Sequence, residues 1–155
     1  MMRAAVACLL LLGCRMDGKT MDVKKLVGGL RSDEIRCATF RPPGSQFATL
    51  ERRVMVTAPD GAKRLAESGD PAVLDQLVPL LADPARAWAA EVILAAMTRN
   101  EEKMVDVYMR SPDEWWKVLG PTARDRWQKW LDERRGRLTW DPAEKWFRLA
   151  PAGPG

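Results

Sequence analysis

The side chains that most often carry out catalysis are scarce in this chain of 155 residues. It has no histidine, the residue used most widely as a general base near neutral pH and as a metal ligand. Three cysteines are present, Cys8, Cys14 and Cys37. Without histidine, a cysteine nucleophile would need a lysine or arginine neighbour to lower the pKa of its thiol. The residue types therefore argue against a catalytic nucleophile activated by a general base.

The carboxylates are numerous, but their spacing does not suit acid–base catalysis. Asp113 and Glu114, like Asp132 and Glu133, are adjacent, and adjacent side chains on a helix point in different directions. Glu91 interrupts an apolar stretch, and a buried carboxylate needs a partner or a shifted pKa. We expect it to pair with an arginine or lysine of a neighbouring helix, a functional acid being the alternative. No phosphate loop, serine elbow or metal-ligand spacing is found, so we predict a protein that is not an enzyme and has no metal or cofactor.

The charge pattern argues against nucleic-acid binding. Lysine and arginine number 25 against 21 aspartate and glutamate residues, a formal charge of +4, with 46% hydrophobic and 30% charged residues. Acidic residues interrupt the basic stretches, as at Arg124, Asp125 and Arg126. Nucleic-acid binding depends on clustered cations that no acid opposes. The composition is that of one folded domain without a dedicated phosphate-binding face.

Seven tryptophans are the other notable group of residues. Trp88, Trp127, Trp130 and Trp140 fall at helix or strand spacing that suits a hydrophobic core. Trp115 and Trp116 are adjacent, so a helix can bury only one of them deeply, and the other is a reasonable contact for a partner. We take Trp115, Trp116 and Arg124 as the candidate partner-binding residues.

The N-terminus has the layout of a secretory signal. Arg3 is followed by nine apolar residues over 4–12, then by Gly13 and Cys14. This apolar run is far shorter than the roughly 20 residues that a membrane-spanning helix needs. It predicts a segment that is read by the export machinery.

The sequence Leu11-Leu12-Gly13-Cys14 resembles the lipobox of bacterial lipoproteins. This resemblance implies that residues 1–13 are a cleaved signal peptide and that residues 14–21 are a lipidated cysteine with its tether. The lipid on Cys14 would anchor the chain to a membrane. Cys8 would be lost with the leader, leaving Cys37 without an intramolecular partner. The alternative is that translation starts at Met16 or Met21.

Most of the remaining chain has helical periodicity. Apolar residues at helical spacing predict helices over 22–30, 46–57, 70–81, 87–97, from 100 onward, 111–119 and 121–135. Residues 87–97 are apolar nearly all round, which predicts a central buried helix. Pro79 should bend the preceding helix, because its ring displaces a backbone hydrogen bond.

Local signals predict where several helices begin and end. Asp83 can cap the helix that follows, with Pro84 at its first position. Ser111-Pro112-Asp113-Glu114 has the pattern of a capping box, and Gly120 is expected to end that helix.

The C-terminal part changes its period. Leu138 and Trp140 alternate with polar residues, as do Phe147 and Leu149. Asp141-Pro142 lies between these stretches and favours a turn, so a small β-hairpin is predicted. Residues 150–155 are expected to be disordered.

A bent helix, an Asp-x-x-Arg turn and an alanine-rich helix together resemble a HEAT-like repeat. The features are Leu74 to Leu81 with its proline, then Asp83 and Arg86, then Ala87 to Ala96. The resemblance implies an all-α fold over residues 22–149, a short stack of antiparallel helical hairpins that serves as a binding scaffold. The chain departs from the family in its short turn and in lacking a clear second repeat.

These interpretations together predict a bacterial lipoprotein. It would lie in the cell envelope, anchored through the lipid on Cys14 and facing the periplasm or the exterior, and would bind an unidentified protein partner. One alternative is an immunity protein that neutralises a secreted toxin. Another is a cytoplasmic helical scaffold with a misassigned start.

Overall fold

The computed structural model of the chain describes residues 21–40, 53–99 and 110–150. The predictions for the leader, for Cys14, for the helix from residue 100 and for residues 151–155 lie outside these ranges.

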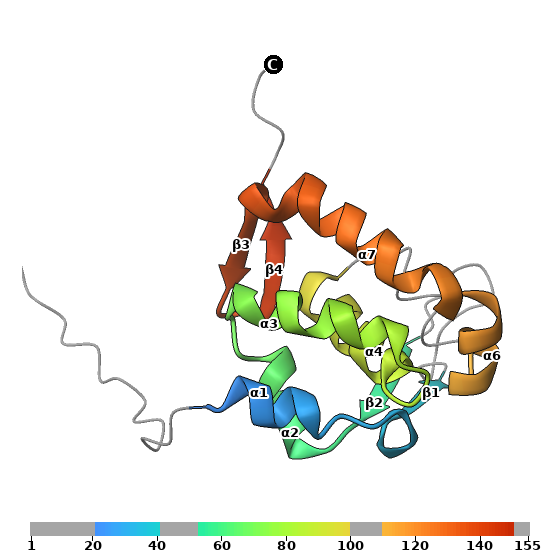
Figure 1. Ribbon diagram of the computed structural model, residues 1–155. Coiled ribbons are helices and arrows are strands. Elements are labelled where there is room, and N and C mark those ends of the chain that lie inside the picture. The colour runs from blue at the N-terminus through green and yellow to red at the C-terminus, as the bar shows by residue number, and fades with distance from the viewer. Residues whose placement is uncertain (1–20, 41–52, 100–109, 151–155) are drawn as a thin grey trace, which may run out of the picture.

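The described part of the chain is mostly helical, with a small antiparallel hairpin near the C-terminus (Figure 1). This confirms the predicted helical character and the predicted hairpin. The helices are α1 (Val23–Gly28), α2 (Asp60–Ala66), α3 (Pro71–Leu77), α4 (Ala87–Thr98), α6 (Pro112–Val118) and α7 (Gly120–Arg134). Three short 3₁₀ turns are η1 (Ser32–Glu34), η2 (Val78–Ala82) and η3 (Arg135–Arg137), and the strands are β1 (Arg36–Phe40), β2 (Arg53–Thr57), β3 (Leu138–Asp141) and β4 (Trp146–Leu149).

Helix α4 forms the centre of the core, as its composition predicts. Every residue of α4 except Ala96 is buried. Helices α2, α3 and α6, the 3₁₀ turn η2 and strand β4 all pack against it. A helix surrounded in this way can be apolar on all sides, which is the pattern that its sequence shows.

The predicted bend at Pro79 is confirmed. Helix α3 ends at Leu77, and the chain continues as the tighter 3₁₀ turn η2 through Pro79. A proline ring removes one backbone donor and clashes with the preceding turn, so the α-helical ladder stops before it. The turn then packs against both α4 and α7, which links the two longest helices.

The central helix begins at residue 87 as predicted, but the predicted cap before it was wrong. Asp83 does not cap α4, which begins at Ala87. Its carboxylate instead accepts the backbone N–H of Ala85 at 3.0 Å and the guanidinium of Arg86 at 2.6 Å. The pKa of Asp83 is lowered first by the Arg86 hydrogen bond and then by that of Ala85. Asp83 therefore stabilises the turn before the helix, with Pro84 inside that turn.

The capping box at the start of α6 is confirmed. The Ser111 hydroxyl accepts the Glu114 backbone N–H, and the Glu114 carboxylate accepts the Ser111 backbone N–H at 3.0 Å. The expected role of Gly120 was wrong, because this residue begins α7 rather than ending α6. A Cβ atom at Gly120 would overlap the indole of Trp116, so a residue without a side chain lets the two helices meet closely.

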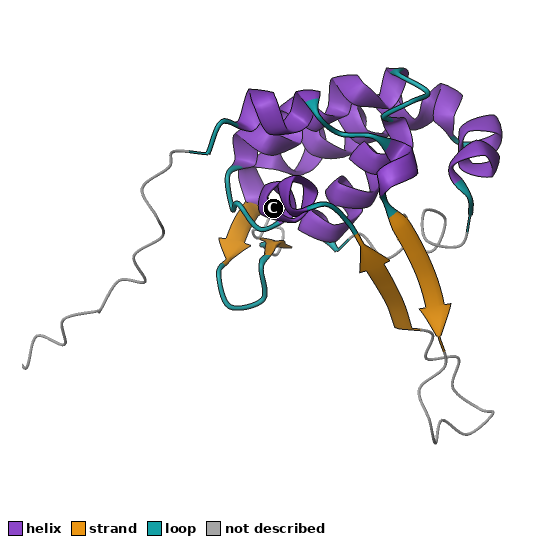
Figure 2. Ribbon diagram, turned by 90° about the horizontal axis from the view of Figure 1, so that it is seen from below, coloured by secondary structure: helices purple, strands orange, loops and turns teal. Residues whose placement is uncertain are grey.

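The predicted helix over 46–57 was also wrong for the residues that are described there. Residues 53–57 form strand β2, which pairs antiparallel with β1 so that Cys37 lies opposite Val56. The β-branched residues of β2 favour an extended backbone once a partner strand is available. The hairpin projects from the helical body in Figure 2.

The predicted C-terminal hairpin is present, and the structure gives its register. Strand β3 pairs antiparallel with β4, with Trp140 opposite Phe147 and with Leu138 opposite Leu149. The Asp141 carboxylate accepts two backbone N–H groups of the turn, from Ala143 and Glu144, each at 3.0 Å. In Figure 1 the hairpin follows the C-terminal end of α7 and lies beside it.

Candidate binding site

The predicted partner-binding residues lie around the start of α7 and differ in exposure. Trp115 is 0% exposed and belongs to the core, so its indole offers no surface to a partner in this structure. Trp116 is half-buried and lies against Gly120, and Arg124 is exposed on α7. The expectation that only one of the adjacent tryptophans is deeply buried is confirmed. Trp116 and Arg124 stay predicted contacts.

The tryptophans expected in the core divide into two groups. Trp88 is 3% exposed and Trp127 is 1% exposed, so both are core residues. Trp130 and Trp140 are partly buried and pack against the core from its edge. Glu91, on α4, is fully buried and is not without an interaction partner.

Cys37 lies half-buried on β1 as a free thiol. Burial raises its pKa from the ordinary 9.0 to about 11. Because the thiolate and not the thiol is the nucleophile, this side chain is largely unreactive at neutral pH.

This pKa predicts slow alkylation of Cys37 in the folded protein. In a variant carrying Cys8→Ser and Cys14→Ser, the rate with iodoacetamide should keep rising with pH towards about 11. When the same variant is unfolded in urea, its alkylation rate should level off near pH 9.0, the ordinary pKa of the thiol. The contribution of the neutral thiol to stability is present below pH 9 and is lost as the pH rises from 9 to 11. A folded-state profile that levels off near pH 9 would contradict the buried position of Cys37.

The described ranges hold neither a metal-binding cluster nor a membrane-spanning helix. Across residues 21–40, 53–99 and 110–150, no group of three or more metal-ligating side chains is found. No helix within the same ranges is long and apolar enough to cross a membrane.

A pocket lies where the end of α4, the C-terminal half of α7 and strand β4 meet. Its volume is about 490 Å³, within the range of small-molecule and side-chain binding sites. We call it the arginine–tryptophan pocket after five of its lining residues, which are Arg99, Trp130, Arg134, Trp146 and Arg148. Three arginines and no acidic residue belong to the described lining.

Arg99 is the residue directly after α4, and its backbone has the left-handed conformation. Its φ angle is 41°, a conformation that non-glycine residues rarely adopt. The chain turns there, directly after the buried Thr98, whose hydroxyl donates to the Leu94 carbonyl at 2.8 Å. The Arg99 guanidinium lies 5.0 Å from the centre of the Trp146 ring, which is cation–π distance.

Helix α7 contributes a second pair of cation and aromatic ring. Trp130 and Arg134 are four residues apart and therefore share one face of the helix. The Arg134 guanidinium lies 5.3 Å from the centre of the Trp130 ring. The edge of Trp130 packs against the buried Trp127, with ring centres 5.5 Å apart, so the core fixes this indole from behind.

Strand β4 forms the third wall of the pocket, and residues from both faces of the strand belong to the lining. Phe147 is 3% exposed and points into the core, where its ring packs 5.0 Å from that of Trp140. Trp146 and Arg148 lie on the opposite face, since side chains alternate along a strand. The Arg148 guanidinium is 5.9 Å from the centre of the Trp146 ring. Two guanidiniums therefore lie within 6 Å of one indole.

The carboxylates near the pocket lie at its rim. Glu144 pairs with Arg99 at 3.5 Å, and about half of each side chain is exposed. Asp141 holds Arg148 at 2.6 Å, and Glu133 holds Arg134 at 2.7 Å. The pKa of Asp141 is lowered first by the backbone N–H of Glu144, so this carboxylate is committed to the hairpin turn. The loosest of the three pairs is that of Arg99 with Glu144.

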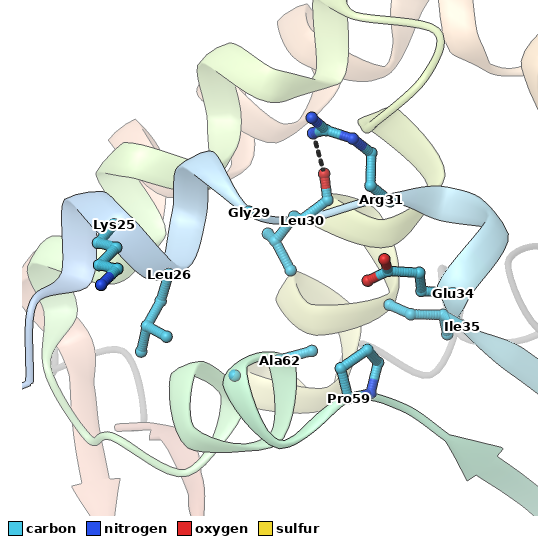
Figure 3. A pocket seen from close by; sticks show the side chains of 10 residues that line it. Lys25, Leu26, Gly29, Leu30, Arg31, Glu34, Ile35, Pro59 and Ala62 are labelled. Atoms are coloured by element: carbon cyan, nitrogen blue, oxygen red, sulfur yellow. Dashed lines mark hydrogen bonds between the residues drawn. The ribbon is translucent and has the colours of Figure 1, made fainter.

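Two other hollows are smaller and mostly apolar. One lies between α1 and α2 and has a volume of about 180 Å³ (Figure 3). Leu26, Leu30 and Ala62 line it, and the Arg31 guanidinium turns away to donate to the Leu30 carbonyl at 2.9 Å. A second, of about 160 Å³, lies beside the β1–β2 hairpin and includes Val56. Neither gathers charged groups of one sign, so neither is as well suited to select a ligand.

Sequence reasoning missed the arginine–tryptophan pocket. Two local signals were present, namely the four-residue spacing of Trp130 and Arg134 and the two-residue spacing of Trp146 and Arg148. Each places a cation beside an aromatic ring on one face of its element. The contribution of Arg99 has no such signal, because it depends on how α4 ends against the hairpin.

Comparison with known proteins gives no guide to this site. No protein-family model matches the chain, and searches of curated proteins and of solved structures give no match.

Proposed function

We propose that this chain is a bacterial lipoprotein of the cell envelope, anchored through Cys14, that binds another protein through the arginine–tryptophan pocket and catalyses no reaction. The observation that carries the binding role is the set of three arginines and two indoles held around one hollow. Arginine and tryptophan are the residue types most enriched where binding energy concentrates in protein interfaces. The buried Trp127 supports Trp130 from behind, so this indole loses little side-chain freedom when a partner binds.

The helical architecture supports a scaffold of the HEAT-like kind. Helix α3 with its 3₁₀ extension η2 packs against α4, and η2 also packs against α7. Stacked helix pairs of this type cover one another's apolar faces and leave an outer surface for binding. On this proposal the C-terminal hairpin closes one end of the stack and supplies one wall of the pocket.

The anchoring part of the proposal rests on the sequence before the folded domain. Seven residues, 15–21, separate Cys14 from Asp22, which caps α1 by accepting the Lys25 backbone N–H at 3.1 Å. A lipid on Cys14 would therefore hold the helical domain close to the membrane surface. Acyl chains contribute about 0.8 kcal/mol per buried methylene, so more than one chain is needed for a stable anchor.

Metabolic labelling tests this anchor. Bacteria that express the chain and receive radioactive palmitate should label the wild-type protein, and Cys14→Ser should remove the label because the attachment atom is gone. Cys8→Ser is the matched control, since Cys8 lies within the proposed leader, and it should keep the label. An unlabelled wild-type protein, or a labelled Cys14→Ser variant, would overturn the anchoring proposal.

A further inference from the structure

We infer that the arginine–tryptophan pocket recognises a short acidic segment of the partner protein, one in which a carboxylate side chain lies next to an apolar one. This inference rests on the proposed protein-binding function and adds the chemistry of the segment bound. It follows from the charge, the aromatic surface and the rim of the pocket.

The arginines of the pocket can bind an anion on the side that lines the hollow, although each also pairs with a carboxylate outside the lining. The described lining includes Arg99, Arg134 and Arg148 and no acid. A guanidinium presents a planar fork of donors that matches the two oxygens of a carboxylate. Within the chain, one oxygen of Glu144 already lies 3.5 Å from an Arg99 guanidinium nitrogen, with about half of each side chain exposed. A carboxylate from a partner can take the place that Glu144 holds, at little cost, since exposed ion pairs of this kind are weak.

The indoles select an apolar neighbour beside that carboxylate. Trp130 and Trp146 are partly buried members of the same lining, together with the half-exposed Leu149. Aromatic side chains bind apolar groups through large contact areas and lose little conformational entropy. A segment that alternates acidic and apolar residues would satisfy both surfaces at once, whereas a small inorganic anion would leave the indoles uncovered.

The rim favours an inserted segment over an extended anionic surface. Glu133, Asp141 and Glu144 surround the arginines, each at ion-pair distance from one of them. A flat anionic membrane would meet these carboxylates as well as the arginines and would be repelled by them. A single carboxylate that enters the hollow approaches the guanidiniums from the side of the described lining, which includes no acidic residue.

A peptide-binding measurement tests the inference. The full chain carrying Cys14→Ser is titrated into a fluorescein-labelled peptide with the core Asp-Leu-Glu-Phe, and anisotropy is recorded at low salt. We expect saturable binding that weakens with added sodium chloride, because the contacts are charged. The peptide with the core Asn-Leu-Gln-Phe is the matched control, and its affinity should be lower by about tenfold because it lacks the carboxylates.

Variants locate the binding. Arg99→Gln and Arg148→Gln should each weaken binding of the acidic peptide by about tenfold, since each removes a charge-assisted hydrogen-bond donor. Arg64→Gln, an exposed arginine on α2, should leave the affinity unchanged. Glu144→Gln should tighten binding by a few-fold, because it removes the internal competitor. Circular dichroism checks that each variant keeps its fold. Because the two arginine variants lie on different elements, one of them still tests the inference if the other fails to fold.

Several results would overturn the inference. They are equal binding of the two peptides, loss of binding in Arg64→Gln equal to that in Arg99→Gln, or inorganic phosphate competing as well as unlabelled acidic peptide. Binding to vesicles with 30% phosphatidylglycerol in place of the peptide, about the fraction of anionic lipid used for such tests, would assign the arginines to a membrane instead. Palmitate labelling of Cys14 does not depend on any of these results, so failure here is distinguishable from failure of the anchoring proposal.

Discussion

Replacing Trp127 by alanine is expected to lower the free energy of unfolding by about 3 to 5 kcal/mol, the usual cost of removing a buried aromatic side chain. Trp127 is 1% exposed on α7 and is among the largest fully buried side chains of the described core. Its removal would leave a void between α7 and the rest of the core that nearby side chains cannot fill completely. Urea denaturation followed by far-UV circular dichroism measures the change.

Two further substitutions control this measurement. Trp127→Phe keeps an aromatic ring in the same place and should cost clearly less than alanine. Val118→Ala removes a side chain that is 59% exposed, and it should change stability by less than about 0.5 kcal/mol. If Trp127→Ala lowered the free energy of unfolding no more than Val118→Ala, this would contradict the packing of α7 against the core. Because Trp127 supports the Trp130 ring edge-on, its loss should also loosen one wall of the arginine–tryptophan pocket.

The second large effect is expected at Gly69, between α2 and α3. Gly69 has a φ angle of +67°, and a Cβ atom added there would lie 2.7 Å from Nε1 of Trp140. The left-handed conformation costs a residue with a side chain roughly 1 to 2 kcal/mol, and the forced movement of the indole adds about 1 to 3 kcal/mol. Gly69→Ala should therefore lower the free energy of unfolding by about 2 to 5 kcal/mol, measured by urea denaturation.

Gly28→Ala is the matched control for Gly69→Ala. Gly28 is the last residue of α1, and a Cβ atom there would meet nothing within 4 Å. Alanine in that place should be neutral or stabilise the protein by up to about 1 kcal/mol. In a Trp140→Leu background the cost of Gly69→Ala should fall, since the clash with the indole is gone. Equal costs in the two backgrounds would contradict the contact between Gly69 and Trp140.

Local sequence signals predicted those elements whose form is decided locally. The alanine-rich run of α4, the capping box at Ser111 and the change of period at Leu138 all correspond to elements of the structure. Each signal lies within one element or one turn, so no distant partner is needed to interpret it. The bend after Leu77 was predictable for the same reason, because Pro79 imposes it directly.

The β1–β2 hairpin was not predictable in this way. Val54 and Met55 fit both a helical and an extended pattern, so periodicity over 46–57 did not separate the two. The deciding factor is the pairing of β2 with β1, in which Thr39 lies opposite Val54. Strand formation depends on a partner strand and its packing, and a single segment does not carry that information.

The candidate site was missed for a related reason. The sequence directed attention to Trp115, Trp116 and Arg124, near the start of α7. The pocket lies near the other end of that helix, ten residues further on at Arg134, or roughly 15 Å along the axis. Three elements supply its arginines, and only tertiary packing brings them together.

Site-specific photo-crosslinking in living cells tests most directly the claim that this pocket is where a protein partner binds. The full chain is expressed with benzoylphenylalanine in place of Leu149, which is 43% exposed in the pocket lining, or in place of Val118, which is 59% exposed on α6. We predict a discrete protein adduct from position 149 that is lost when Arg99→Gln is added, and no such adduct from position 118. An adduct from position 118 alone, or one from position 149 that persists with Arg99→Gln, would contradict the account.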